Sequence, residues 1–322
     1  MQNLISSMLN GNRRSLSKLV SAIEHGNLDL DLLVNNIQDR ISDSYTIGIT
    51  GPSGSGKSTV AGNLINMLSK ENLKVAFLAI DPTSPFDGGA LLGDRIRIAD
   101  LNLNENVFIR SMGTRGSGGG LNVVVGITVD LFAAFGFDII IVESVGVGQV
   151  DIDIMNISDT VIVTTVPEAG DEIQMLKRGL IEIADIFIVN KIDRPGSNHI
   201  ARALEEEVAS QATNSDWMPP VILSQANKNI GIDLIREAIQ NHKGFLKDSG
   251  VIFTKRGLNR ERQFVNLVEK NLVNSIREFL FSDKQMLALR SKVKQGELNP
   301  YVAALELNKL IDFNNKNNLV PK

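Results

Sequence analysis

A glycine-rich segment at residues 51–59 holds the first residues whose types and spacing could do chemistry. It reads Gly-Pro-Ser-Gly-Ser-Gly-Lys-Ser-Thr, a glycine loop that ends in lysine and a hydroxyl residue. Backbone N–H groups of such a loop, with the positive end of a following helix, surround a polyphosphate. Lys57 would reach the β- and γ-phosphate oxygen atoms, and the Ser58 hydroxyl would contact Mg²⁺. The nucleotide-binding residues expected here are Gly51, Pro52, Ser53, Gly54, Ser55, Gly56, Lys57, Ser58 and Thr59.

The elements that must position this loop are a strand before it and a helix after it. Tyr45–Thr50 is rich in β-forming residues, and residues 60–68 carry apolar side chains at helical spacing. The four fixed positions of the pattern recur by chance on the order of once in a hundred chains of this length. The flanking strand and helix make a chance match rarer still, so we interpret the segment as a phosphate-binding loop.

Strand-like and helix-like segments alternate from residue 45 to about residue 242. The strand candidates are apolar throughout, as expected for a parallel sheet that is covered on both faces. They are Tyr45–Thr50, Lys74–Ile80, Val107–Arg110, Phe137–Val142, Asp159–Val166, Ile186–Val189 and Val221–Leu223. The expected crossover helices are Leu121–Phe135, Asp171–Ala184, Ile200–Gln211 and Ile232–Asn241. The pattern predicts an α/β fold of the P-loop NTPase type, with its ligand at the carboxyl ends of the strands.

A second loop, Asn190-Lys-Ile-Asp193, directly follows one of these strands and has the spacing of a guanine-reading element. The Asp193 carboxylate could accept hydrogen bonds from N1–H and N2–H of guanine, whereas adenine offers neither donor there. The stem of Lys191 could lie along the base, and Asn190 could tie this loop to the phosphate loop. Taken alone, four residues are more often a solvated turn. Behind a phosphate loop and a strand, they predict guanine specificity.

Residues Ser224, Gln225 and Ala226 follow the last predicted strand, at the position of a further guanine-contacting loop. Backbone N–H groups at this place would meet the guanine O6 atom. Three residues are too few to be independent evidence for guanine binding. If only backbone N–H groups contact the base, the side chain of Gln225 does not affect this contact.

Acidic residues at strand ends are candidate Mg²⁺ ligands. The strand before Glu143 is followed by Gly146, whose N–H would meet the γ-phosphate. Asp81 ends another strand, and Asp94 lies in a glycine-containing segment that could move. The alternatives are a helix cap for Asp81 and a surface ion pair for Asp94.

The residue that would position the attacking water is not at its usual place. Val147 follows Gly146, where many GTPases carry a glutamine, so unassisted hydrolysis should be slow. Gln149 lies two residues further on and could take this role only after a rearrangement, such as one imposed by a partner. The expected catalytic residues are Lys57 and Gln149.

The two ends of the chain differ from its middle. Residues 1–44 carry two short helical patterns separated by His25-Gly-Asn27, and these helices would form either a docking arm or a lid on the core. Residues 45–250 would form the GTPase domain. Residues 251–322 carry helical patterns only, and we expect a second subunit to cover their apolar stripe in a homodimer.

Composition excludes several classes of function. The net charge of −4 gives no basic surface of the kind that binds nucleic acid, and no apolar run is long enough to span a membrane. The absence of cysteine excludes disulfides and thiolate metal sites. With no secretory pattern at the N-terminus, we expect a cytoplasmic protein or, as the alternative, an organelle matrix protein numbered without its transit segment.

Taken together, these residues resemble the MeaB or ArgK family, the GTPases that chaperone adenosylcobalamin-dependent methylmalonyl-CoA mutase, with the methylmalonic aciduria type A protein as mitochondrial counterpart. The motifs that carry the resemblance span about residues 10–245. They are Gly51–Thr59, Ala79–Ser84, Gly93–Arg95, Thr114–Leu121, Val142–Gln149, Asn190–Asp193 and Trp217–Val221 before Ser224. Departures from the family pattern occur at Val150 and Gln225 and in the short N-terminal arm.

The resemblance implies GTP as substrate, GDP as product, and Mg²⁺ held by Ser58, Asp81, Asp94 and Glu143. It also implies a homodimer through the C-terminal helices and hydrolysis stimulated by the mutase, which would gate the loading of intact cofactor and the ejection of damaged cofactor. Which acyl-CoA mutase is the client stays open.

Two other functions compete with this one. A metal-insertion GTPase, like those of hydrogenase and urease, is disfavoured because cysteine is absent and the three histidines, His25, His199 and His242, are widely spaced. A kinase that uses the same loop is also disfavoured, because no acceptor site or protein-kinase catalytic loop is visible.

Overall fold

The computed structural model describes residues 1–41, 43–81, 104–113, 120–146, 156–168, 182–211 and 216–310. The chain divides into two compact units, Met1–Asn266 and Leu267–Lys322. The first unit contains the sheet and its covering helices, and the described part of the second is helical. Within the described residues, no helix combines the length and apolarity needed to cross a bilayer.

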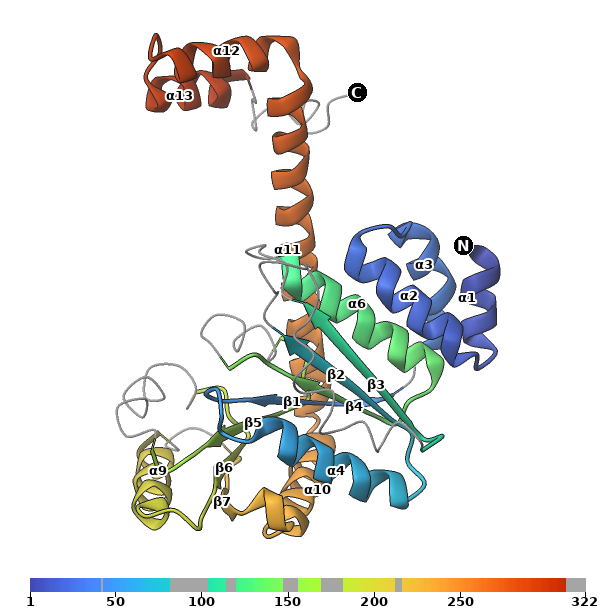
Figure 1. Cartoon of the computed structure of the whole chain (residues 1–322), viewed down its shortest axis with the longest axis vertical. Coiled ribbons are helices and arrows are strands. Elements are labelled where there is room, and N and C mark those ends of the chain that lie inside the picture. Colours follow the sequence, from blue (N-terminus) through green and yellow to red (C-terminus); the bar gives the residue numbers. More distant parts are fainter. Residues whose placement is uncertain are drawn as a thin grey trace. The chain divides into compact units, whose positions relative to one another are not determined.

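A seven-stranded sheet forms the centre of the first unit (Figure 1). Its strands are β1 Tyr45–Thr50, β2 Val75–Asp81, β3 Val107–Gly113, β4 Ile139–Glu143, β5 Thr160–Thr165, β6 Ile186–Asn190 and β7 Val221–Ser224. The strand order is β3-β2-β4-β1-β5-β6-β7, and every described pairing in it is parallel. The predicted α/β class is confirmed, and each strand candidate overlaps one observed strand.

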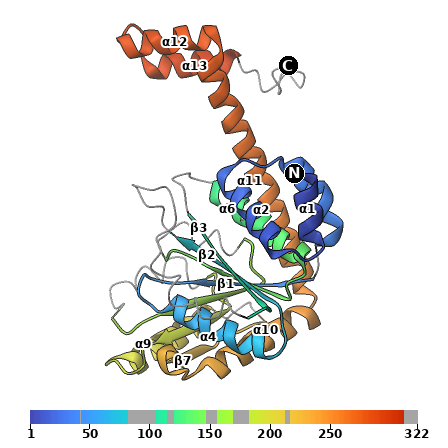
Figure 2. The ribbon, with the colours of Figure 1, turned by 45° about the vertical axis from the view of Figure 1, so that its right-hand side comes forward.

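Helices cover both faces of this sheet, which explains why the strands are apolar throughout. On one face, α4 Lys57–Lys70 and α10 Ile232–Asp248 pack on alternate strand residues such as Ile47 and Ile141. On the other face, α6 Gly120–Phe135 packs on Ile140 and Val142. Figure 2 shows α4 and α10 on the side of the sheet opposite to α6. The predicted crossover helices are therefore present where they are described, and α9 spans Ser197–Gln211. Most of the expected helix Asp171–Ala184 lies outside the described residues.

The N-terminal segment forms three helices, not the two predicted. They are α1 Gln2–Leu9, α2 Arg13–His25 and α3 Leu30–Ile37. The sequence reading missed α1 because this eight-residue helix has no side-chain cap at Met1, whereas Asn12 and Asp29 cap the helices that follow. Side chains of all three helices are buried with Leu78, Phe132 and other residues of the α6 face. The N-terminal segment therefore covers this face of the core, as expected for a lid.

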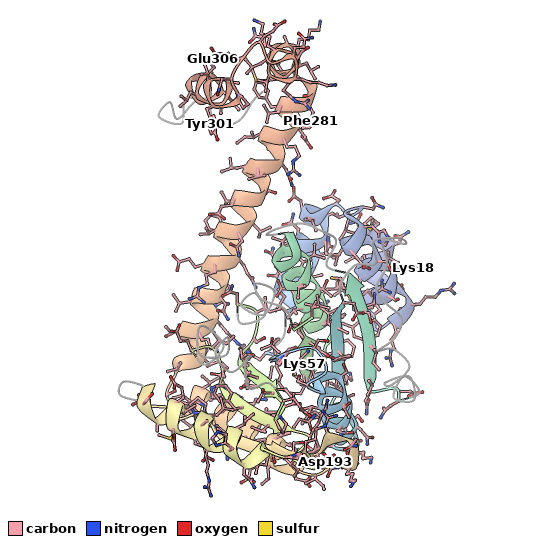
Figure 3. All side chains as sticks on the ribbon, turned by 60° about the vertical axis from the view of Figure 1, so that its left-hand side comes forward. Lys18, Lys57, Asp193, Phe281, Tyr301 and Glu306 are labelled. Carbon is pink, nitrogen blue, oxygen red and sulfur yellow. The ribbon has the colours of Figure 1, made fainter. Side chains whose placement is uncertain are left out.

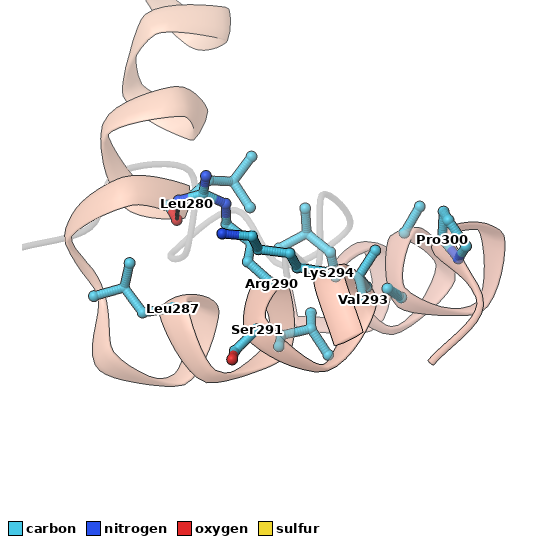
Figure 4. Close-up of a pocket in the computed structure, with 11 residues that line it drawn as sticks. Leu280, Leu287, Arg290, Ser291, Val293, Lys294 and Pro300 are labelled. Atoms are coloured by element: carbon cyan, nitrogen blue, oxygen red, sulfur yellow. Dashed lines mark hydrogen bonds between the residues drawn. The ribbon is translucent and has the colours of Figure 1, made fainter. Parts of the chain in front are cut away.

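The last helices begin after α10. Helix α11 spans Val251–Ser282, α12 spans Lys284–Gln295 and α13 spans Pro300–Leu310. In the second unit, a cavity of about 670 Å³ lies between α12, α13 and the end of α11, with Leu287, Val293 and Pro300 in its lining (Figure 4). Phe281 and Tyr301 are 61% and 82% exposed in the same unit. Its described helices therefore leave apolar surface uncovered.

Candidate functional site

The glycine loop lies between the end of β1 and the start of α4, as the pattern predicts. Gly51 has a φ of +134°, and a Cβ atom there would lie 1.9 Å from the Thr164 carbonyl oxygen of the neighbouring strand β5. Only glycine fits this position, because the loop must leave the sheet directly beside β5. The backbone is thereby placed against the start of α4, whose free N–H groups favour an anion.

Lys57 is the first residue of α4 and is only 6% exposed. Its ammonium group donates hydrogen bonds to the carbonyl oxygen atoms of Gly51 at 2.8 Å and Pro52 at 3.0 Å. The ammonium group therefore lies against the loop backbone. In the nucleotide complex, phosphate oxygen atoms would replace these two carbonyl oxygen atoms as its acceptors. Lys57 and Asp193 are both labelled in Figure 3.

Oxygen ligands for a metal ion gather next to Lys57. The Ser58 hydroxyl donates a hydrogen bond of 2.7 Å to Oε1 of Glu143. Glu143 is in register with Ile49 on β1 and with Ala79 on β2, so Asp81 lies two residues further along at the same edge of the sheet. Both carboxylates are buried, with exposures of 7% for Glu143 and 8% for Asp81.

This set of donors fits Mg²⁺. Oxygen ligands suit the ion, and Mg²⁺ in nucleotide sites is held by one or two carboxylates together with phosphate and water. The part of the chain that the structure describes contains no group of three or more His, Cys, Asp or Glu residues that could hold a metal ion. Asp94, the fourth expected ligand, lies outside the described residues.

Gly146 brings the end of the β4 segment over the phosphate loop. Its φ is +87°, and a Cβ atom there would lie 2.2 Å from the Gly51 carbonyl oxygen and 2.6 Å from Nζ of Lys57. Ser144 supports this approach, because its hydroxyl donates to Oγ1 of Thr50 at 2.8 Å. The glycine thus lies where a γ-phosphate would come close to the chain. Val147 and Gln149, which follow it, lie outside the described residues.

Asn190 joins three loops, as the sequence suggested for its contact with the phosphate loop. Its Nδ2 donates to the Ser55 carbonyl oxygen at 2.8 Å, and its Oδ1 accepts from the Ala226 N–H at 3.1 Å. The side chain is 3% exposed. Lys191 has a φ of +61°, which turns the chain outward and leaves Asp193 exposed. A base bound here would therefore find the Asp193 carboxylate accessible.

The last predicted loop, residues 224–226, lies beside Asn190. Two of its backbone N–H groups, which were expected to meet guanine O6, already have hydrogen-bond partners within the protein. The N–H of Gln225 donates to the Ile230 carbonyl oxygen at 3.1 Å, and the N–H of Ala226 is bound to Asn190. A guanine O6 atom would have to share or replace one of these acceptors. Ser224 is fully buried, and its hydroxyl donates to the Ile230 carbonyl oxygen at 3.0 Å.

Sequence reasoning missed one residue that supports these loops. Nδ2 of Asn63, on α4, donates a hydrogen bond of 2.6 Å to the Ala226 carbonyl oxygen. A single asparagine inside a helix carries no sequence signal for such a role, because its partner is 163 positions away.

Comparison with known proteins assigns the family. A family model described as the methylmalonyl-CoA mutase-associated GTPase MeaB matches residues 16–279. The chain belongs to this family. The resemblance inferred from the motifs is confirmed, and the protein is a GTPase that binds guanine nucleotide.

Relatives of this MeaB-family GTPase match it over most of its length. A putative GTPase of Pyrococcus horikoshii is 38% identical, covering 96% of this chain and 98% of its own. The GTPase ArgK of Escherichia coli is 32% identical, with coverages of 94% and 93%. The mitochondrial methylmalonic aciduria type A homolog of Mus musculus is 31% identical over 81% of this chain and 64% of its own. A crystal structure described as an LAO/AO transport system kinase is similar with a TM-score of 0.70 and 26% identity, covering 96% of both chains.

Proposed function

We propose that this GTPase is a chaperone of an adenosylcobalamin-dependent acyl-CoA mutase, most directly methylmalonyl-CoA mutase. The family description names that mutase, which supports this choice of partner. GTP hydrolysis would gate the loading, protection and reactivation of the mutase cofactor, and the protein would act in the cytoplasm.

In this proposal, three groups of residues share the nucleotide. Lys57, the loop residues 51–56 and Gly146 hold the phosphates, and Asp193, Lys191 and residues 224–226 hold the guanine. The Ser58 hydroxyl, Glu143, Asp81 and Asp94 would hold Mg²⁺. When bound, the ion neutralises charge that develops on the β- and γ-phosphates.

The water-orienting residue is the step that a partner would control. Val147 has no group that can orient water, and Gln149 is the nearest glutamine after it. The protein alone should therefore hydrolyse GTP slowly, and a bound mutase should accelerate it by placing Gln149. Because coupling between sites is reciprocal, the GTP and GDP forms should bind the mutase with different affinities.

The decisive experiment is single-turnover hydrolysis of GTP with and without purified methylmalonyl-CoA mutase, together with mutase affinity in each nucleotide state. Acceleration by the mutase and unequal affinities would support the proposal. Isobutyryl- and ethylmalonyl-CoA mutases, tested alongside, would identify another client. Equal rates and equal affinities with all of them would leave a GTPase without the proposed chaperone role.

We also propose a homodimer formed through the second unit. The support is the apolar surface on its helices, including Tyr301 and Leu305, which are 82% and 61% exposed. Light scattering should show a dimer for the wild-type protein and a monomer for the double variant Tyr301→Asp, Leu305→Asp. Lys18→Asp, an exposed change on α2, is the control and should remain dimeric. A double variant that stays dimeric would place the interface elsewhere.

A further inference from the structure

The last turn of α2 contacts the end of the edge strand β3 through Glu24. Oε1 of Glu24 accepts a hydrogen bond from the Gly113 N–H at 3.1 Å, and Oε2 lies 3.1 Å from the guanidinium of Arg110. Arg110 also donates to the Ser21 hydroxyl at 2.9 Å. The Glu24 side chain is only 10% exposed, so a nearly buried carboxylate ties the helix to the strand end.

Glu24 occupies a place that a helix disfavours for an acidic residue. Helix α2 ends at His25, and the carbonyl groups of a last turn carry partial negative charge. Local preferences are usually broken where the fold needs a residue for another purpose. Here the purpose visible in the structure is the pair of bonds to Gly113 and Arg110.

The strand end that Glu24 holds lies beside the proposed metal ligands. Gly113 is in register with Asp81 on β2, and Ala79 of β2 is in register with Glu143 on β4. Because β3 is at the edge of the sheet, it has a strand partner on one side only. The hydrogen bond from the Gly113 N–H to Glu24 therefore restrains the end of β3, as a further strand would if β3 were not at the edge.

We infer that Glu24 is a positioning residue for Asp81, acting through the end of β3 to fix that carboxylate beside Ser58 and Glu143. The inference rests on the proposed function, in which Asp81 is a Mg²⁺ ligand. Loss of Glu24 would let the ends of β3 and β2 move and would weaken Mg²⁺ binding. The guanine loops would be unaffected, because they follow β6 and β7 at the other side of the sheet.

The chain offers a matched control on the same helix. Arg13, the first residue of α2, donates to the Glu105 carbonyl oxygen at 2.9 Å and also to the Val107 carbonyl oxygen. It ties the same helix to the same strand, but at the amino end of β3. If both contacts only stabilise the packing of α2 on β3, Arg13→Ala and Glu24→Ala should have similar effects on Mg²⁺ binding.

The test measures how Mg²⁺ slows the release of a fluorescent N-methylanthraniloyl GDP from the full-length protein, with EDTA as the metal-free reference. Glu24→Ala should raise the Mg²⁺ concentration needed for half of this slowing by about three- to tenfold, which is the worth of the lost hydrogen bond to the Gly113 N–H. Release in EDTA should be unchanged. Glu24→Gln keeps an acceptor for the Gly113 N–H and should restore most of the Mg²⁺ response, whereas Arg13→Ala should match the wild type.

Asp81→Asn separates the inference from the function on which it rests. If Asp81→Asn raises the Mg²⁺ requirement but Glu24→Ala does not, the metal site stands and the role of Glu24 is refuted. Equal shifts for Glu24→Ala and Arg13→Ala, or no rescue by Glu24→Gln, refute it as well. If Asp81→Asn has no effect, the metal assignment itself fails. Should Glu24→Ala not fold, Glu24→Asp draws the carboxylate back from Gly113 and is judged by the same outcomes.

Discussion

Asn190 gives the sharpest prediction for the candidate site, because one small side chain joins the phosphate loop to both guanine loops. We consider the substitution Asn190→Ala. It removes the donor to the Ser55 carbonyl oxygen and the acceptor for the Ala226 N–H, at 2.8 and 3.1 Å. Nothing else about the backbone needs to change, so the consequence follows from the two lost bonds.

The magnitude depends on the burial of the groups left behind. Ser55, Ala226 and Asn190 are 0%, 3% and 3% exposed, so water cannot readily replace the missing partner. Each buried polar group that loses its hydrogen bond costs about 1–3 kcal/mol. Two such groups predict that Asn190→Ala lowers the free energy of unfolding by roughly 2–6 kcal/mol. Guanine nucleotide affinity should fall by at least about tenfold, because the loops that carry the ligands are no longer joined.

The assay uses the only tryptophan of the chain. Trp217 donates its indole N–H to the Asp185 carbonyl oxygen in the first unit, so its fluorescence during urea unfolding reports on the sheet. Asn63→Ala is the matched control. It removes a single bond of 2.6 Å to the Ala226 carbonyl oxygen and should cost only about 1 kcal/mol.

The reasoning is refuted by either of two results. Asn190→Ala could lower the free energy of unfolding by less than Asn63→Ala does, which would mean that the two buried bonds contribute little. Alternatively, the variant could be destabilised as expected and still bind GTP like the wild type. The loops would then hold their positions without Asn190.

Three further substitutions test other parts of the structure. Gly146→Ala should abolish GTP hydrolysis while the protein stays folded, since its Cβ would lie 2.2 Å from the Gly51 carbonyl oxygen; normal turnover would contradict the site geometry. Asp193→Asn should weaken GTP binding and admit xanthosine triphosphate in a competition titration, and an unchanged preference for GTP would remove the guanine assignment. Burial lowers the pKa of His242 from 6.5 to about 4, so the stability that depends on neutral His242 is complete above pH 6.5 and is lost, by up to roughly 3 kcal/mol, as the pH drops toward 4. His242→Gln should lose this pH dependence of urea unfolding.

Much of the fold could be predicted because the strands are covered on both faces. Such strands are continuous apolar segments, and all seven were located from that feature. The site followed from the same logic, because parallel strands bring their carboxyl ends together. Glu143 and Asp81 are far apart in sequence, yet each ends a strand, and the register of β2 with β4 places them at one edge.

The rest depends on tertiary contacts that leave no local pattern. Helix α1 is short and uncapped, so only its packing against the core stabilises it. The bond between Glu24 and Gly113 joins residues 89 positions apart, and nothing near Glu24 in the sequence points to β3. In the same way, the occupied N–H groups of Gln225 and Ala226 follow from loop geometry that residue types alone do not specify.

The amino-terminal ends of strands β5 and β6 bind the start of helix α11. Asp159 precedes β5 and Asp185 precedes β6, so parallel strands bring these two acids together as well. Lys255 of α11 donates to Oδ2 of Asp185 at 2.9 Å, and Nε of Arg256 donates to Oδ1 of Asp159 at 2.8 Å. Asp159 is only 5% exposed, whereas the Arg256 side chain is 28% exposed, so this ion pair is partly buried. The start of α11 is therefore fixed to the sheet by charge, at the edge opposite to the phosphate loop. Because the two edges use different residues of the same strands, a substitution such as Arg256→Met should weaken the anchoring of α11 without touching any group that holds the nucleotide.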